Sequence, residues 1–146
     1  MATRDRELGV ELFNRAWALL ESPGPDPDEL AHCAHASAYH WMHGGGTVAN
    51  RARSEWQCSR VYAVLGRPEP SLHHARRCLE LCESAPEEIE EFDLPFAYEA
   101  LARAHALAGN DAAAQEWLVR ARAAGEAIAD EDDRDLLRSD LSTIGR

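Results

Sequence analysis

The sequence predicts an all-α protein, and two observations support that prediction. Apolar residues recur at helical spacing along the 146-residue chain, whereas no stretch alternates apolar and polar residues as a half-buried strand does. Clusters of proline and glycine divide the helical stretches into seven segments of ordinary helix length. Because this chain length is typical of one domain, we expect residues 1–146 to form a single helical domain.

The first helix pair is predicted over residues 3–43. The Pro/Gly segment 22–25 separates its two helices. Asp26 before Pro27 is a suitable start for the second helix, because proline at the first helical position lacks only a donor that would have no partner. Three glycines at 44–46 then end the pair. The apolar face of the first helix consists of Leu12, Phe13, Ala16, Trp17 and Leu20.

A second helix pair is predicted over residues 47–84 and a third over 93–129. Thr47 is a suitable N-cap for the second pair, since its hydroxyl can accept a hydrogen bond from a backbone N–H of the first turn. Gly66 and Gly109 end the first helix of their pairs, where a left-handed C-cap residue is favoured. Both pairs therefore have a start and a turn that the sequence specifies.

The remaining segments are acidic. The connection at 86–93, PEEIEEFD, is expected to form a solvated link or a frayed turn. Asp93 is then expected to cap the fifth helix, and Asn110 the sixth. Asp130 should cap a last helix over 130–144, which we expect to cover the open end of the stack with a polar face.

A shift of 43 residues aligns the second pair with the third and indicates an internal repeat. Gly66 falls on Gly109, and Arg60 falls on Arg103. Small residues also coincide at three places where helices should cross: Ser59 with Ala102, Ser71 with Ala114, and Cys78 with Ala121.

In these features the chain resembles the tetratricopeptide-repeat family. Helix pairs of that family carry small residues at the crossings, an aromatic residue such as Tyr62 before the turn, and a glycine that ends the first helix. The spacing of 43 differs from the family's length of about 34, and the proline that often closes each repeat is missing. The resemblance implies a right-handed superhelix of antiparallel helix pairs that holds a protein or peptide partner in a concave groove.

The resemblance also implies a partner-binding site, because the first helix of each pair lines the groove in that family. The matching positions carry Arg53, Trp56, Arg60 and Val64 in one pair, and Phe96, Glu99, Arg103 and Leu107 in the next. Arginine binds carboxylates bidentately, and tryptophan buries a large area at low entropic cost. The candidate partner-binding residues are Arg53, Trp56, Arg60, Phe96 and Arg103, and we expect an acidic peptide segment as the ligand.

The charge distribution leaves two interpretations of these arginines open. The net charge of −11 argues against nucleic acid as a partner. Residues 51–77, which we call the basic segment, hold six arginines against two acids. Two alternatives follow: either the acidic remainder of the fold neutralises this segment, or the segment attracts an acidic partner. If Arg60 and Arg103 line the groove, reversing their charge should leave folding nearly intact, whereas unfolding would indicate buried ion pairs.

Composition excludes several other classes. Charges interrupt the N-terminal stretch, and no segment approaches the ~18 apolar residues of a membrane span. We therefore expect a cytoplasmic protein without a membrane partner. The four cysteines form no CxxC pair and are expected to be structural thiols. No nucleophile elbow, phosphate loop or zinc-protease motif is present, so we expect neither an enzyme nor a cofactor.

Two alternatives to a peptide-binding module stay open. Four histidines, His32, His35, His40 and His43, are spaced as two possible metal half-sites, and a metal- or small-molecule-binding protein would use them. They lack a nearby third and fourth ligand, so we expect no metal. A homo-oligomer would instead dock the acidic segments 86–93 or 130–135 on the basic segment of a second copy. Trp17, Trp41 and Trp117 are expected to be core residues, whereas Trp56 is expected in the groove.

Overall fold

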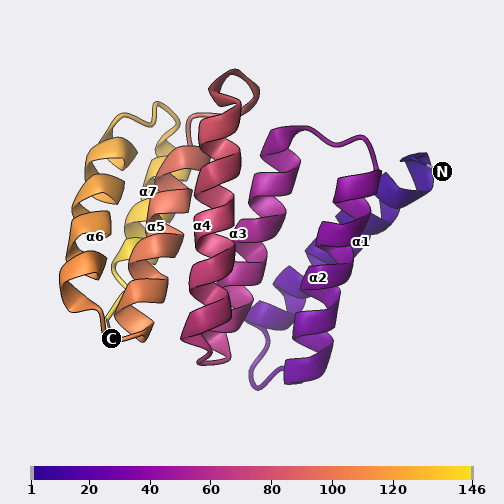
Figure 1. Cartoon of the computed structure of the whole chain (residues 1–146), viewed down its shortest axis with the longest axis horizontal. Coiled ribbons are helices and arrows are strands. Elements are labelled where there is room, and N and C mark those ends of the chain that lie inside the picture. The colour runs from indigo at the N-terminus through magenta and orange to yellow at the C-terminus, as the bar shows by residue number, and fades with distance from the viewer. Residues whose placement is uncertain (1, 146) are drawn as a thin grey trace.

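The computed structural model describes residues 2–145, which form seven α-helices that run alternately up and down (Figure 1). Within these residues there is no strand, so the prediction of an all-α fold is confirmed. The helices are α1 (Ala2–Glu21), α2 (Pro27–His43), α3 (Val48–Val64), α4 (Pro68–Ser84), α5 (Asp93–Leu107), α6 (Asp111–Glu126) and α7 (Glu131–Leu141). A short 3₁₀ turn, η1 (Pro86–Glu88), lies between α4 and α5.

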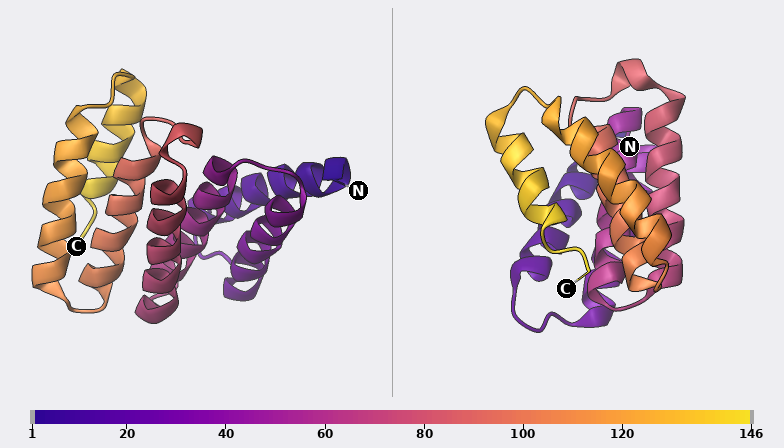
Figure 2. Two further views of the ribbon diagram at one scale, coloured as in Figure 1. Left: turned by 45° about the horizontal axis from the view of Figure 1, so that its top comes forward. Right: turned by 90° about the vertical axis from the view of Figure 1, so that its left-hand side faces the viewer.

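The helices form two layers. Each helix packs against the next one in the chain, and α1 also contacts α3, α3 contacts α5, and α5 contacts α7. The odd-numbered helices therefore lie next to one another in one layer, and α2, α4 and α6 form the second layer (Figures 1 and 2). None of the helices described is both long and apolar enough to cross a bilayer. One face of the molecule is thus built from odd-numbered helices alone.

Local sequence signals place three of the helix starts, those of α2, α3 and α7. Asp26 accepts a hydrogen bond from the backbone N–H of Glu29 at 2.9 Å, and Asp130 caps α7 in the same way. Thr47 and Asn50 form a reciprocal capping box at the start of α3. These three caps confirm the predicted helix starts, since each satisfies a backbone donor that has no partner within the helix. Asn110 also occupies an N-cap position, but its side chain makes no capping bond.

The two predicted glycine turns have the same geometry. Gly66 and Gly109 have φ angles of +72° and +82°, in the left-handed region that disfavours side chains. Behind Gly66, the N–H of Arg67 donates to the carbonyl of Tyr62 at 2.9 Å, which is the long hydrogen bond of a Schellman motif. The equivalent bond ends α5 behind Gly109. The 43-residue repeat is therefore a repeat of the turn as well as of the sequence.

Small residues lie where the helices of a pair cross. In the second pair, the Ser59 hydroxyl donates to the Ser71 carbonyl at 2.8 Å, and the Ser71 hydroxyl donates to the Ser59 carbonyl at 2.9 Å. Both side chains are buried. In the third pair, the buried Ala102 and Ala114 occupy the matching positions. Side chains of this size allow the two backbones to approach closely, and in the second pair the serines also satisfy their own hydroxyl groups.

The acidic connection at 86–93 differs from its prediction at one residue. Asp93 is only 4% exposed and is the first residue of α5, not its N-cap. Its carboxylate accepts two hydrogen bonds from the Arg53 guanidinium and one from the backbone N–H of Glu90. The predicted cap is therefore wrong, because a partner 40 residues away in the sequence draws this carboxylate inward. The segment is solvated at its glutamates and anchored at its last residue.

Helix α7 was expected to cover the end of the stack with a polar face, but it also contributes buried leucines to the core. Its Leu137 and Leu141 are buried in a cluster with Leu118 and Ile128. Gly125 of α6 allows this approach, because a Cβ atom at that position would lie 2.5 Å from Leu137 Cδ2. The other face of α7 points toward the odd-numbered layer, so this helix has an apolar face and a face that borders the site described next.

Candidate functional site

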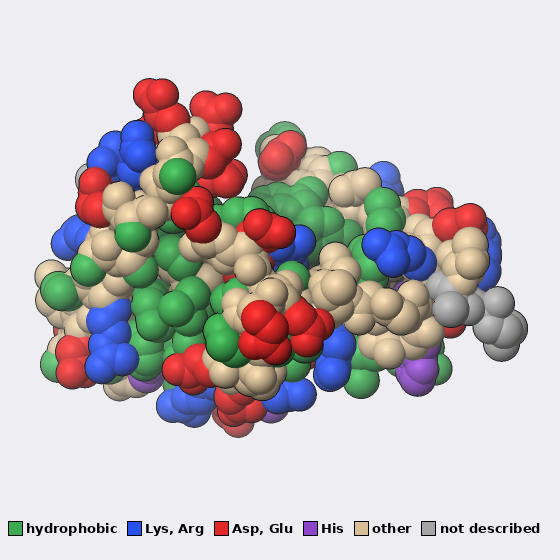
Figure 3. Space-filling model, turned by 90° about the horizontal axis from the view of Figure 1, so that it is seen from above, with side chains coloured by type: hydrophobic (Ala, Val, Ile, Leu, Met, Phe, Trp, Pro, Cys, Tyr) green, Lys and Arg blue, Asp and Glu red, His purple; other side chains and the backbone are tan. Residues whose placement is uncertain are grey.

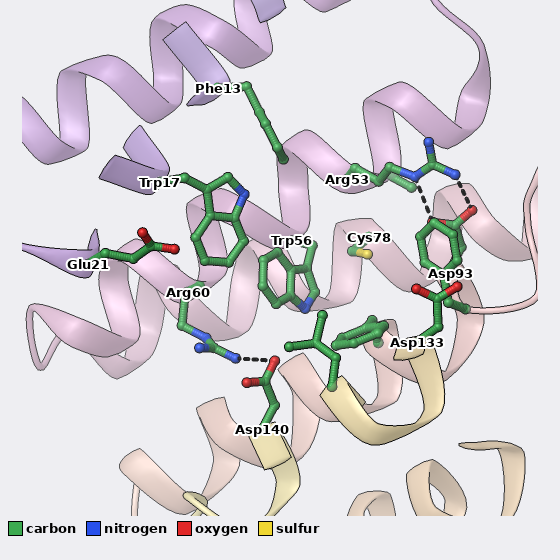
Figure 4. A pocket seen from close by; sticks show the side chains of 14 residues that line it. Phe13, Trp17, Glu21, Arg53, Trp56, Arg60, Cys78, Asp93, Asp133 and Asp140 are labelled. Atoms are coloured by element: carbon green, nitrogen blue, oxygen red, sulfur yellow. Dashed lines mark hydrogen bonds and ion pairs between the residues drawn. The ribbon is translucent and has the colours of Figure 1, made fainter. Parts of the chain in front are cut away.

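The odd-numbered helices border a groove that encloses about 390 Å³ (Figures 3 and 4). On α1, Phe13, Trp17 and Glu21 are four residues apart, so they share one face of the helix and line one wall. Helices α3 and α5 line the middle of the groove, and α7 forms the opposite wall with residues that include Leu136. In Figure 3 hydrophobic side chains lie in the hollow between two lobes, and acidic side chains gather on the α7 lobe.

Aromatic side chains follow one another across the groove. Trp17 of α1 contacts Trp56 of α3 with ring centroids 5.4 Å apart, and Trp56 contacts Phe96 of α5 edge-to-face at 5.9 Å. Phe13 extends this series beyond Trp17, and Phe92 extends it beyond Phe96. All five rings are only partly buried. The groove therefore presents an aromatic surface shared by three helices, which we call the aromatic floor.

Arg53 lies at one end of the aromatic floor. Its Nε and Nη2 atoms donate to the two carboxylate oxygens of Asp93, each at 2.9 Å, and its guanidinium lies over the Phe92 ring at 4.9 Å. The hydrogen bonds with Asp93 raise the pKa of Arg53 above its ordinary value. This bidentate pair neutralises the charge of Arg53 within the chain.

Glu99 connects the groove helices from below. Its buried carboxylate accepts hydrogen bonds from Trp56 Nε1 at 3.3 Å, Arg60 Nη2 at 3.1 Å and Arg103 Nε at 3.0 Å. Arg60 also forms an ion pair with Asp140 of α7 at 3.3 Å, and burial raises the pKa of that aspartate. Arg103 donates to the backbone carbonyl of Asp140 at 2.8 Å. These five residues, which we call the Glu99 network, tie α3, α5 and α7 together.

The predicted partner-binding residues lie together, but their charges are already paired. Arg53, Trp56, Arg60 and Phe96 line the same groove, and Arg103 lies in the adjoining hollow, which Arg60 also borders. All three arginines form ion pairs with acids of α5 or α7. Of the two interpretations of the basic segment, these ion pairs favour the one in which the fold neutralises it. Acids of the same chain neutralise the three arginines, including one from the 86–93 segment.

Two carboxylates of the groove have no ion-pair partner among residues 2–145. Glu21 lies beyond Trp17 at the end of α1, and Asp133 lies at the opposite end of the groove, on α7 (Figure 4). Partial burial raises the pKa of Asp133, and the negative charges of Asp130, Asp132 and Glu91 raise it further. The charge that the groove leaves unbalanced is therefore negative.

Sequence reasoning missed two walls of the groove. Trp17 was expected in the core but lines the groove with Phe13. The spacing of Phe13, Trp17 and Glu21 matches that of Ala52, Trp56 and Arg60, and this match was a usable signal. Leu136 of α7 is 55% exposed and faces the groove, although α7 was expected only to cover an end. No pattern in the sequence places that helix beside the groove.

The histidine-rich stretch of α2 turns toward several different neighbours. His35 Nε2 hydrogen-bonds the Tyr62 hydroxyl at 2.8 Å, whereas His40 Nδ1 pairs with Asp5 at 2.8 Å. His43 packs against Tyr39 on the same helix. In the part of the chain that is described, no group of three or more His, Cys, Asp or Glu side chains is arranged to hold a metal ion. His35, His40 and His43 thus each contact a different side chain.

Cys78 lies at the bottom of the groove and is the one thiol that borders it. A hydrogen bond with Cys82 and burial raise the pKa of Cys78 well above its ordinary value. A protonated thiol is a poor nucleophile, so this residue contributes apolar surface to the groove.

Comparison with known proteins identifies no family for this arrangement. The chain matches no protein-family model. No curated protein and no solved structure matches it either.

Proposed function

We propose that the protein is a non-enzymatic interaction module that holds a segment of a partner protein in the groove. The observation that carries this proposal is the aromatic floor, which stays partly exposed in a hollow of about 390 Å³. Large aromatic side chains are enriched where proteins bind partners, and a continuous apolar surface of this kind marks interaction sites. Residues of α1, α3, α5 and α7 line the groove, so a bound chain segment would contact all four helices.

The repeat architecture supports the same proposal. The second and third helix pairs share a 43-residue spacing, matching Schellman turns, and small residues at their crossings. We therefore propose that the chain is a tetratricopeptide-like repeat protein that coils as a right-handed superhelix. Stacked repeats of this kind build extended concave surfaces, and binding at such a surface is their usual role.

Two buried carboxylates beside the aromatic floor, Asp93 and Glu99, also favour binding over catalysis. General acid or base chemistry needs a group with a free proton or lone pair directed at a substrate. Glu99 is held by three donors, and Asp93 by Arg53 and a backbone N–H. These carboxylates are committed to holding helices together, which keeps the aromatic floor in place.

Two matched arginine substitutions test the proposal. Leu136 on α7 is 55% exposed and faces the groove, and Val119 on α6 is 59% exposed and lies outside it. Wild type, Leu136→Arg and Val119→Arg would each be used for affinity capture from native cell extract, with thermal melts to check folding. Both side chains are already solvated, so both variants should fold.

We expect a partner that wild type and Val119→Arg retain and that Leu136→Arg loses, because the arginine would fill the groove. A photo-crosslinking residue at position 136 should then attach to that same partner, and one at position 119 should not. Equal capture by all three proteins would place binding elsewhere and contradict the proposal.

A further inference from the structure

We infer that the groove binds a basic segment, in which an apolar or aromatic anchor is flanked by arginine or lysine on both sides. This inference rests on the proposed function and deepens it. It also reverses the acidic ligand that the sequence predicts, since the arginines that suggested such a ligand are used within the fold.

Within the described residues, both guanidinium groups that line the groove have acidic partners. Four carboxylates and two guanidinium groups line the groove. Asp93 binds Arg53 bidentately, and Glu99 and Asp140 share Arg60. An acidic ligand would meet guanidinium groups whose charge is already balanced, and it would compete with their internal partners. The groove therefore disfavours an acidic segment.

The unpaired negative charges lie at the two ends of the groove. Glu21 lies at the Trp17 end of the groove, and Asp133 lies at the end where Arg53 meets Asp93 (Figure 4). Within the described residues neither carboxylate has an ion-pair partner. The aromatic floor lies between them, so a segment that fills the groove would reach both carboxylates from a central apolar anchor.

The groove combines aromatic rings with carboxylates, and both kinds of group bind arginine and lysine. Aromatic faces attract guanidinium and ammonium groups, and carboxylates bind arginine through paired hydrogen bonds. The chain already uses this combination at Arg53, which lies over Phe92 and pairs with Asp93. At the other end, Trp17 and Glu21 offer an aromatic ring and a carboxylate without an arginine of their own. A ligand arginine would complete that arrangement.

Three labelled peptides of equal length provide the probe. Each carries a central Trp-Leu pair, and the flanking positions on both sides are Arg in the first, Gln in the second and Glu in the third. Fluorescence anisotropy at physiological salt measures their affinity for the full chain. We expect the Arg peptide to bind at least about tenfold more tightly than the Gln peptide, and the Glu peptide to bind most weakly.

A matched pair of double variants assigns this preference to the groove. Glu21→Gln/Asp133→Asn removes the two unpaired carboxylates, whereas Glu87→Gln/Glu116→Gln removes two exposed acids outside the groove. The groove variant should reduce the preference for the Arg peptide to below about threefold, and the control should keep it. Binding of the Gln peptide should stay the same in both, because it reports the aromatic floor alone.

Several results would overturn the inference while leaving the proposed function intact. One is a competition assay in which the Glu peptide displaces the captured partner at the lowest concentration of the three peptides. Another is an equal loss of preference in the control variant, which would show that the net charge of −11 attracts the Arg peptide. A third is self-association that Leu136→Arg abolishes, because the occupant would then be a second copy of the chain. If Leu136→Arg leaves Arg-peptide binding unchanged, the peptide binds outside the groove and the inference also fails.

Discussion

At the scale of single residues, Glu99 shows how an unfavourable group becomes structural. A carboxylate without solvent contact would normally take up a proton or force its helix outward. Here Arg60 and Arg103 donate to its two oxygens, and Trp56 adds a third hydrogen bond. Removing one donor would leave charge uncompensated in a buried place, so the cost should far exceed that of an exposed ion pair.

A pair of alanine substitutions tests this contrast. Arg60→Ala should lower the free energy of unfolding by about 3–5 kcal/mol, as expected when a buried ion pair loses one partner. Arg138→Ala breaks the pair between Arg138 and Glu126, whose side chains are 53% and 61% exposed, and should change stability little. Urea unfolding of both variants gives the comparison. A second change, Glu99→Gln, should restore part of the loss in Arg60→Ala; equal losses in the two single variants would refute this role of Glu99.

The same geometry changes the expectation for charge reversal. From the sequence, reversing Arg60 or Arg103 should leave folding nearly intact if both face a ligand. In the structure Arg60→Glu would place a third carboxylate beside Glu99 and Asp140. We therefore expect unfolding rather than a selective loss of binding, and these arginines are unsuitable positions for testing the groove.

At the scale of helices, the contact between α6 and α7 depends on one missing side chain. Gly125 is the last residue but one of α6, where replacing glycine with alanine would ordinarily stabilise a helix by up to about 1 kcal/mol. Here the added Cβ would lie 2.5 Å from Leu137 Cδ2, and Leu137 is buried. Since α7 forms a wall of the groove, the size of residue 125 also influences where that wall stands.

Gly125→Ala should therefore destabilise the protein, by about 1–3 kcal/mol for an overpacked core. The reason is the clash with Leu137, so the sign should reverse when that side chain is shortened. In a Leu137→Ala background, Gly125→Ala should stabilise the helix as it would in an isolated segment. Thermal melts of the four proteins complete the cycle. Additive effects would mean that α7 moves away without cost and that the close approach is unimportant.

Helix positions were largely predictable, and helix environments were less so. Local signals such as Thr47 and Gly66 act within one turn of the chain, so the sequence reveals them directly. Asp93 was misassigned as a cap because its partner Arg53 is 40 residues away. The role of Leu136 depends on how α7 crosses the stack, which side-chain packing sets and no periodicity encodes. The sequence thus predicted several residues of the groove, but it did not predict which charged side chains pair with one another.

At the scale of the whole molecule, aromatic and histidine side chains join the first helix pair to the rest. His35 of α2 hydrogen-bonds the Tyr62 hydroxyl of α3 at 2.8 Å and contacts the His74 ring of α4 with centroids 5.2 Å apart. Tyr62 stacks on His74, which in turn pairs with Glu55 at 2.6 Å. Because α1 carries one wall of the groove, the way this pair docks also shapes the site.

Protonation of His35 should weaken this junction. Burial lowers the pKa of His35 below the ordinary value of 6.5, and the neighbouring His74 lowers it further. The unfolded chain therefore binds this proton more readily than the folded chain does. Stability associated with His35 is fully present above pH 6.5 and is lost as the pH falls below that value through the lower pKa of the folded state.

His35→Phe tests this coupling because it keeps a ring against Tyr62 and His74 but cannot take up a proton. Wild type should lose more stability than His35→Phe between about pH 7.5 and about pH 5.5, measured by urea unfolding at each pH. His43→Phe is the matched control, since His43 is exposed at the end of the same helix and packs only on Tyr39 among the described aromatic rings. His43→Phe should lose as much stability between the two pH values as wild type does. If all three proteins lose stability equally, His35 does not govern the junction, and acid acts on the fold through other groups.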